Sequence, residues 1–216
     1  RKDDDPSLAK KHFFKALEIN PEYAIAYYEL AHHSKNNGDI NEAKIHFQKA
    51  TDVDQNYVDA YFNLARILTS PSEHDQAVRN YETALEINPE MADCHYWFAK
   101  LLTTGERLSN DGTLLKEPKI DDAKKHFTRA IDIDPKFAKA YYRLGLLLYH
   151  NKDYSNALFN LEKAITLDPT FSKAHYSLAV LLMDKNAKGL VQKGAKTEKK
   201  KKKGSTRKKT PGQESS

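Results

Sequence analysis

The sequence repeats itself, and this repeat constrains the fold more than any other feature. Blocks 24–57 and 58–91 are each 34 residues long, and 138–171 follows the same pattern. A period of roughly 20 to 50 residues indicates stacked copies of one small unit, because a single unit cannot bury its own apolar face. The seventh place of each block is large and apolar, and the eighth is small. These places hold Leu30, Leu64, Phe98, Leu144 and Leu178, and Ala31, Ala65, Ala99, Gly145 and Ala179.

Block 138–171 indicates what the unit is. Apolar residues return at helical spacing through Tyr141, Leu144 and Leu148, and a second helical period follows the polar residues 151–153. Pro169 ends the second period, because proline lacks an N–H and pushes the preceding residue out of helical geometry. Small residues at facing places let two helices approach closely. Each block is therefore predicted to form two antiparallel helices.

The spacing and the recurring residues resemble the tetratricopeptide repeat family, whose period is about 34 residues. The second half of each block adds matching small residues, and three of the four blocks add a proline, where block 24–57 has Gln55. They are Ala43, Ala77, Ala123 and Ala157, then Ala50, Ala84, Ala130 and Ala164, and finally Pro89, Pro135 and Pro169. The resemblance implies an all-α, right-handed superhelical solenoid of antiparallel helix pairs with one continuous core.

The resemblance does not extend to a subfamily. Chaperone-binding members hold a terminal carboxylate with Lys and Asn residues, but Phe62, Arg66 and Trp97 stand at three of those places here. An asparagine ladder, as in glycosyltransferase-linked arrays, would have only Asn63 as a rung. The subfamily therefore stays unassigned.

Composition divides the chain into a charged N-terminal segment, 1–5, a repeat array, 6–185, and a lysine-rich tail, 186–216. The array is predicted to consist of a half-repeat, four repeats and a second half-repeat, with bounds 6–23, 24–57, 58–91, 92–137, 138–171 and 172–185. Repeat 92–137 is longer because residues 103–119, which contain loop-forming Gly, Asn-Asp-Gly and Pro, are inserted between its helices. This insertion is either a tolerated surface loop or a partner contact.

The net charge of +5 conceals a strong asymmetry along the chain. Residues 186–216 hold 11 Lys and Arg against 2 Glu, so the tail is strongly basic and the rest of the chain is slightly acidic. From Lys196 on, the tail has almost no apolar residue and is predicted to be disordered, while residues 186–194 are either part of this tail or a short capping helix. It is either a solubilising tail or an electrostatic contact to nucleic acid, an acidic protein or an anionic membrane, or a nuclear import signal. The contact residues would be Lys199, Lys200, Lys201, Lys202, Lys203, Arg207, Lys208 and Lys209.

The sequence contains no pattern that would carry catalysis. A P-loop, a GxGxxG, an HExxH, a paired CxxC and a nucleophile elbow are all absent. The histidines fall at scattered repeat places, so we expect no metal site and no cofactor. The single cysteine, Cys94, falls on a helix and is expected to be a buried, reduced thiol. We therefore expect a non-enzymatic protein, located in the cytoplasm or, through the tail, in the nucleus.

The resemblance implies a concave groove lined by the first helix of each repeat, with its second, fifth, sixth and ninth places touching the ligand. Aromatic and cationic side chains at these places favour an extended, acidic peptide. The candidate groove residues are Tyr28, Phe62, Asn63, Arg66, Tyr96, Trp97, Lys100, Lys139, Tyr142, Arg143, Lys173 and Tyr176. The alternative for the fifth-place aromatics is packing between neighbouring helices.

These features favour a protein–protein interaction adaptor or scaffold that binds a peptide or partner protein in its groove. Two alternatives stay open. The first is a nucleic-acid-associated or nuclear factor, in which the lysine-rich tail makes the main contact. The second is a self-assembling scaffold, because the half-repeat 6–23 lacks its first helix and should leave an apolar face uncovered.

Overall fold

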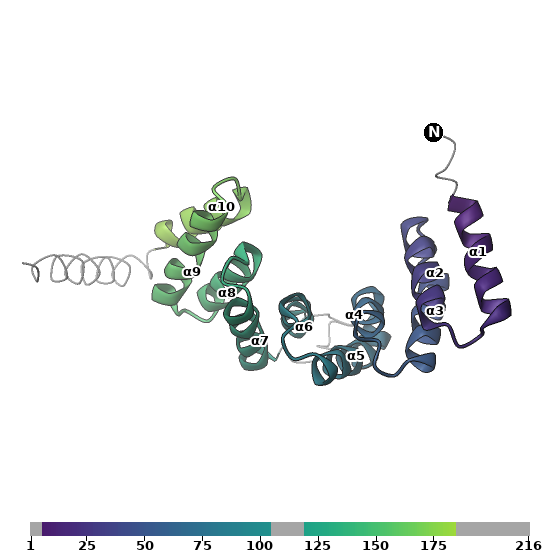
Figure 1. Ribbon diagram of the computed structural model, residues 1–216. Helices are drawn as coiled ribbons and strands as arrows, with labels where there is room; N and C mark the ends of the chain where they lie inside the picture. Colours follow the sequence, from purple (N-terminus) through teal and green to yellow (C-terminus); the bar gives the residue numbers. More distant parts are fainter. Residues whose placement is uncertain (1–5, 105–118, 185–216) are drawn as a thin grey trace, which may run out of the picture. The chain divides into compact units, whose positions relative to one another are not determined.

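The computed structural model describes residues 6–104 and 119–184, and all the regular structure in these ranges is helical. The helices are α1 (Pro6–Ile19), α2 (Ala24–Asn36), α3 (Ile40–Val53), α4 (Val58–Ile67), the short 3-10 helix η1 (Pro71–Glu73), α5 (His74–Ile87), α6 (Ala92–Thr103), α7 (Ile120–Ile133), α8 (Ala138–His150), α9 (Tyr154–Leu167) and α10 (Ser172–Met183). The predicted all-α class is confirmed for this part of the chain (Figure 1).

Three of the predicted features fall partly or wholly outside the described residues. They are the N-terminal segment 1–5, most of the insertion 103–119, and the tail 186–216 with its predicted contact residues.

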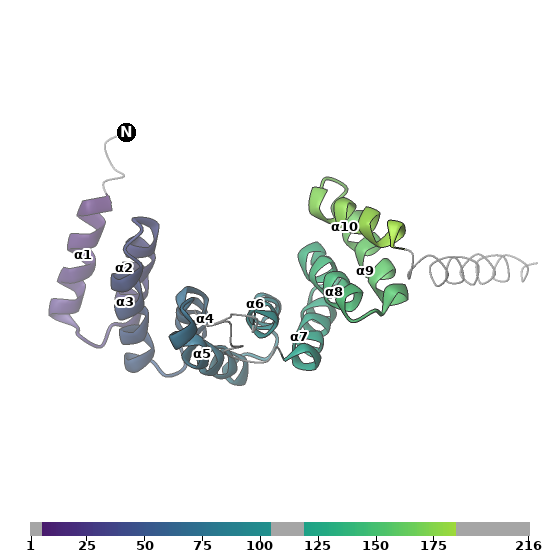
Figure 2. The same ribbon diagram turned by 180° about the vertical axis from the view of Figure 1, so that it is seen from behind.

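The chain forms two compact units, residues 1–133 and 134–216, where the repeat pattern predicted one continuous core. In unit 1, α2 pairs with α3, α4 with α5 and α6 with α7, and α1 packs on α2 (Figures 1 and 2). In unit 2, α8 pairs with α9, and α10 packs on both. In three of the pairs, α2 with α3, α4 with α5 and α8 with α9, a short turn joins consecutive helices and makes them antiparallel, whereas the insertion separates α6 from α7.

The core of each helix pair is built from the small residues of the repeat. In unit 1, Ala31 and Ala43 are fully buried and bring α2 and α3 close together beside the buried ring of Phe47. In unit 2, a Cβ atom at Gly145 would lie only 2.9 Å from Cγ of Leu161. Glycine is therefore required for the close approach of α8 and α9 as they stand.

The first helix of a repeat ends at different places in different repeats, and this difference affects the site. In repeats 24–57 and 138–171, the N–H groups of Asn37 and Asn151 donate to carbonyls four residues earlier, each at 3.1 Å. These bonds extend the first helix to 13 residues, and a residue with positive φ follows, Gly38 or Lys152. In repeat 58–91 the same place is Pro71, which has no N–H to donate.

As a result, α4 has only 10 residues and ends at Ile67. Ser70 is extended, as expected for a residue before proline, and Pro71 begins η1 instead. The turn is held by a capping box between Ser70 and Glu73, and Glu73 also pairs with Lys44 of α3 at 2.6 Å. The second helix of the repeat, α5, still begins at His74, in register with the other repeats.

Candidate functional site

The first helices of unit 1 place three cations at their C-terminal ends. Lys35, Arg66 and Lys100 each lie in the last turn of α2, α4 and α6, respectively. The helix dipole stabilises a cation at this end. The pKa of Lys35 is lowered, first by its partial burial and then by the positive charge of Arg66. The two cations are therefore close enough to repel each other. We call Lys35, Arg66 and Lys100 the basic row.

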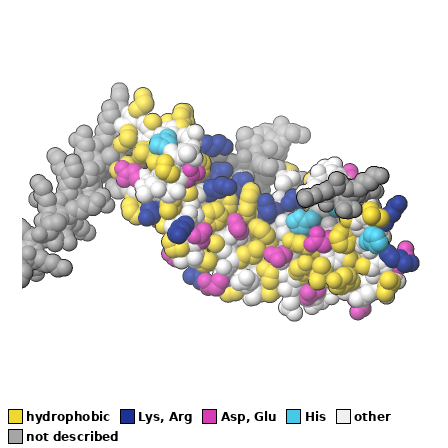
Figure 3. Space-filling model, turned by 45° about the horizontal axis from the view of Figure 1, so that its top comes forward, with side chains coloured by type: hydrophobic (Ala, Val, Ile, Leu, Met, Phe, Trp, Pro, Cys, Tyr) yellow, Lys and Arg dark blue, Asp and Glu magenta, His cyan; other side chains and the backbone are white. Residues whose placement is uncertain are grey.

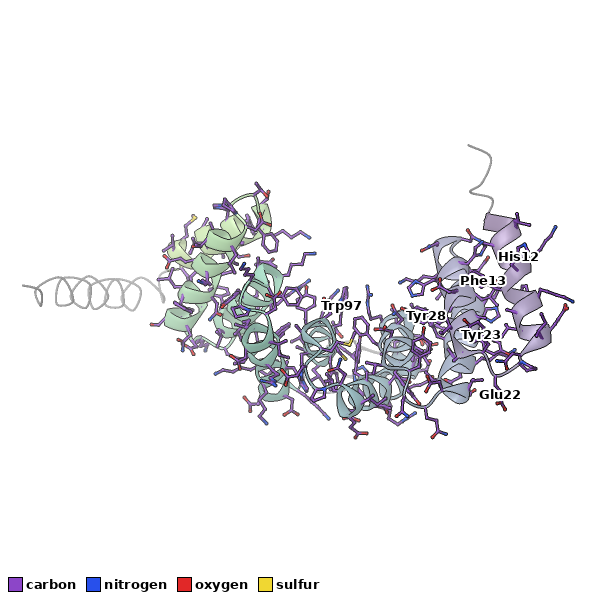
Figure 4. All side chains as sticks on the ribbon, viewed as in Figure 1. His12, Phe13, Glu22, Tyr23, Tyr28 and Trp97 are labelled. Atoms are coloured by element: carbon purple, nitrogen blue, oxygen red, sulfur yellow. The ribbon has the colours of Figure 1, made fainter. Side chains whose placement is uncertain are left out.

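Trp97 connects two members of the basic row. The guanidinium carbon of Arg66 lies 4.6 Å from the Trp97 ring centroid, and Nζ of Lys100 lies 4.4 Å from it. Both are cation–π distances. Figure 4 labels Trp97 on α6 and Tyr28 on α2. In the space-filling view of Figure 3, Lys and Arg side chains lie among hydrophobic side chains on the surface. The Nε atom of Arg66 is buried and has no hydrogen-bond partner in the described part of the chain.

Tyr28 and Asn63 link α2 to α4. The Asn63 side-chain amide donates to the Tyr28 hydroxyl at 3.2 Å and to the Asp59 carbonyl at 2.9 Å. Asn63 is itself buried, so its role is to fix the position of the half-buried Tyr28 rather than to meet a ligand directly.

Two of the predicted groove aromatics are buried between helices. Phe62 and Tyr96 are each only 7% exposed, and their rings pack against Tyr81 and Phe127 of the second helices. Their position matches the alternative interpretation, in which fifth-place aromatics support the helix pairs. The accessible part of the predicted site in unit 1 therefore consists of Tyr28, Arg66, Trp97 and Lys100.

A pocket of about 560 Å³ opens beside these residues, between α4, the turn at Pro71, and α6. Tyr81 and Ala65, which are buried, line the pocket, and so do Trp97, Leu101 and Thr104 of α6 and the turn that follows it. Sequence reasoning missed this pocket. The signal that could have revealed it is Pro71, which stands where repeats 24–57 and 138–171 have Asn.

The predicted groove residues of unit 2 make a more open surface. Lys139 and Lys173 are exposed, and Tyr176 is 73% exposed. The Tyr142 ring packs on Phe171 at 4.8 Å, with the guanidinium carbon of Arg143 5.9 Å from the Tyr142 centroid. These are single contacts between neighbouring side chains.

A pair of histidines on α6 and α7 was also missed, since the sequence placed them at unrelated repeat positions. The Nδ1 atoms of His95 and His126 lie 2.8 Å apart, and Nε2 of His95 lies 3.1 Å from the Pro89 carbonyl. A carbonyl only accepts, so neutral His95 carries its proton on Nε2 and accepts from His126 at Nδ1. Burial and then His95 lower the pKa of His126 to about 4, which keeps this pair neutral near pH 7.

Cys94 is fully buried, and burial raises the pKa of its thiol to about 12, so the reactive thiolate is suppressed. Within residues 6–104 and 119–184, no three His, Cys, Asp or Glu side chains are grouped as metal ligands would be. None of the helices in these ranges is long and apolar enough to cross a membrane.

Family models match three segments of the chain. Tetratricopeptide repeat models match residues 24–57 and 138–171, and the model of regulator of microtubule dynamics protein 1-3 matches residues 74–153. A search of curated protein sequences gave no match.

Several solved structures have the same fold. The MamA protein has a TM-score of 0.66 at 20% identity, covering 89% of this chain and 100% of that one. YrrB, described as a TPR protein with an unusual peptide-binding site, has a TM-score of 0.64 at 25% identity, covering 80% and 82%. A thermophilic TPR protein of Thermus thermophilus has a TM-score of 0.58 at 19% identity, covering 83% and 91%. With its repeating helix pairs and these matches, the chain is a tetratricopeptide repeat protein.

Proposed function

We propose that this protein is a non-enzymatic adaptor whose unit 1 binds an extended, acidic peptide segment of a partner protein along α2, α4 and α6. The observation that carries the proposal is the contact of the Trp97 ring with both Arg66 and Lys100, two members of the basic row on the first helices of consecutive repeats. Cations and an accessible aromatic ring on rigid helices are suited to carboxylates and to the apolar stems that carry them.

The spacing of the basic row supports an extended rather than a compact ligand. Lys35, Arg66 and Lys100 come from three successive first helices, and helices packed side by side are about 10 Å apart. An extended chain advances about 3.3 Å per residue, so acidic residues a few places apart would meet successive cations. The peptide-binding site named for YrrB is further support for this use of the fold.

Selection from a displayed library of random peptides tests the proposal. The wild-type protein should enrich peptides with spaced Asp and Glu residues. Arg66→Gln with Lys100→Gln should lose this enrichment, because two of the three cations are gone. The matched control is Arg79→Gln with Lys124→Gln, which removes the same charge from exposed positions on the second helices α5 and α7. Equal enrichment of acidic and neutral peptides by the wild type would contradict the proposal.

The match of residues 74–153 to the regulator of microtubule dynamics family favours a second candidate, an adaptor that acts on microtubules. Co-sedimentation of the full chain with stabilised microtubules tests it. If the wild type binds microtubules and the variant Arg66→Gln with Lys100→Gln does not, the same site serves both candidate functions. If the wild type does not co-sediment at low salt, the microtubule candidate is wrong.

A further inference from the structure

The pocket beside Trp97 lies where the turn of repeat 58–91 differs from the turns of repeats 24–57 and 138–171. Pro71 cannot donate the hydrogen bond that Asn37 and Asn151 donate, so residues 68–70 leave the helix. Among the described residues, no further helical turn of α4 follows Ile67 next to α6. The pocket of about 560 Å³ lies there, with residues 69–72 along one side.

The walls of this pocket differ in chemistry. Tyr81, which is only 2% exposed, and Ala65 make the buried side apolar. Arg66 and Lys100 bring positive charge to the side that carries Trp97. Asp75, in the first turn of α5, also lines the pocket. Arg66 and Lys100 are therefore the lining residues that would attract an anion, and both lie against Trp97.

We infer that this pocket receives one anionic side chain of the bound peptide, with its charged end at Arg66 and Lys100 and its carbon skeleton against Trp97. The inference rests on the proposed function and adds the residue class that the site selects. Arg66 and Lys100 both line the pocket, and the charged groups of both lie against the Trp97 ring. A carboxylate or phosphate oxygen is the acceptor that a guanidinium binds most strongly.

The size of the pocket separates the two kinds of anion. A pocket of about 560 Å³ falls in the range of ligand sites for whole small molecules and is larger than a single carboxylate side chain requires. Its apolar buried side and the indole of Trp97 favour a flat ring. A phosphorylated tyrosine would use both the apolar side and the cations, whereas glutamate would use only the cations.

The protein supplies its own reporter for this site, because Trp97 is its single tryptophan. Indole fluorescence of the full chain is titrated with the N-acetyl amides of phosphotyrosine, phosphoserine and glutamate, and with those of tyrosine, serine and glutamine as neutral partners. We expect a saturable change with the anionic probes and none with the neutral ones. Phosphotyrosine should bind most tightly, since it fills the pocket.

Pro71→Asn with Ser72→Gly tests whether the pocket itself is responsible. This pair gives repeat 58–91 the Asn-Gly turn of repeat 24–57, and should extend α4 into the pocket while retaining Arg66, Trp97 and Lys100. Affinity for phosphotyrosine should fall by about tenfold or more, with helicity by circular dichroism retained. Arg66→Gln leaves the turn intact and should weaken the anionic probes by a similar factor, while Arg79→Gln should not.

The outcomes separate this inference from the proposed function. Anionic probes that bind the turn variant as tightly as the wild type, or a wild type that responds to none of them, would overturn the inference. If the wild-type protein still selected acidic peptides from the library, the proposed function would remain supported. A preference for glutamate over phosphotyrosine would retain the anion site and assign it to carboxylate side chains.

Discussion

Repeats 58–91 and 138–171 have the same length and the same core places, yet their turns differ. In repeat 138–171, Asn151 continues α8 and the left-handed residue Lys152, with φ of 62°, leads into α9. In repeat 58–91, Pro71 ends α4 early, and a capped 3-10 turn replaces the missing helical turn. The second helix starts at the same repeat place in both. The turn can therefore change without disturbing the register of the helix pair. The pocket lies beside the changed turn of repeat 58–91.

The two repeats also differ in the contact between their helices. Repeat 138–171 joins Gly145 and Leu161, whereas repeat 58–91 has the larger pair Ala65 and Tyr81 at the corresponding places. All four residues are buried. The larger pair occurs in the repeat with the pocket, which it supports from the buried side.

The largest expected effect comes from removing either bulky residue of this contact. Tyr81→Ala should lower the free energy of unfolding by about 3–5 kcal/mol, and Leu161→Ala by about 2–5 kcal/mol, because each leaves a cavity in the core. Urea unfolding followed by circular dichroism measures both. Glu82→Ala, at an exposed neighbouring place, is the control and should change little. A loss below about 1 kcal/mol in either core variant would contradict the packing described here.

A smaller effect is expected from giving repeat 138–171 the proline turn. Asn151→Pro removes the N–H that donates to the Leu147 carbonyl and disfavours helical geometry at His150. We expect a loss of about 1–3 kcal/mol and faster hydrogen exchange in the last turn of α8. Unchanged exchange there would show that proline alone does not shorten the first helix of a repeat.

The positive-φ residues of the two ordinary turns should respond in opposite directions. Gly38→Ala should cost about 1 kcal/mol, because φ of 85° is strained for a residue with a Cβ atom. Lys152→Gly should relieve the same strain, and after the entropy cost of glycine we expect a gain of a few tenths to about 1 kcal/mol. Thermal unfolding of the two variants compares them. Changes of the same sign would be evidence against the role assigned to φ.

The smallest effect concerns the anchor of the Pro71 turn. Hydrogen bonds from Lys44 and then Ser70 lower the pKa of Glu73 from 4.5 to about 2. Because the folded-state pKa is depressed, the contribution of Glu73 to stability is fully present above about pH 4.5 and is lost as the pH falls toward 2. Glu73→Gln should flatten this part of the pH–stability curve. An identical acid slope in both proteins would show that the pair contributes nothing measurable, as many partly exposed ion pairs do.

The sequence predicts the helix pairs well because their core places carry a strong signal. Ala31, Ala43 and Phe47 recur at fixed offsets in later repeats, and helical spacing alone places them on the buried faces. Whether an aromatic side chain at the edge of that face is buried or exposed is harder to predict. Phe62 and Tyr28 occupy the same repeat place, yet one is buried against Tyr81 and the other is half-buried beside Asn63.

The repeat pattern does not predict features that depend on a single residue or on contacts between elements. Pro71 is a single substitution, and its effect becomes visible only when its missing N–H is compared with those of Asn37 and Asn151. His95 and His126 meet through the packing of α6 on α7 across an insertion, which no residue spacing reveals. Both features were therefore found only in the three-dimensional structure.

The indole N–H resonance of Trp97 gives the most direct test of the account. It is the single tryptophan indole signal in the ¹H–¹⁵N spectrum of the full chain, and it reports on the ring that Arg66 and Lys100 contact. With an acidic peptide selected by the wild type, the resonance should shift saturably, and Arg66→Gln should abolish the shift at the same peptide concentration. A resonance that stays in place while the peptide binds would contradict the assignment of the site to α4 and α6.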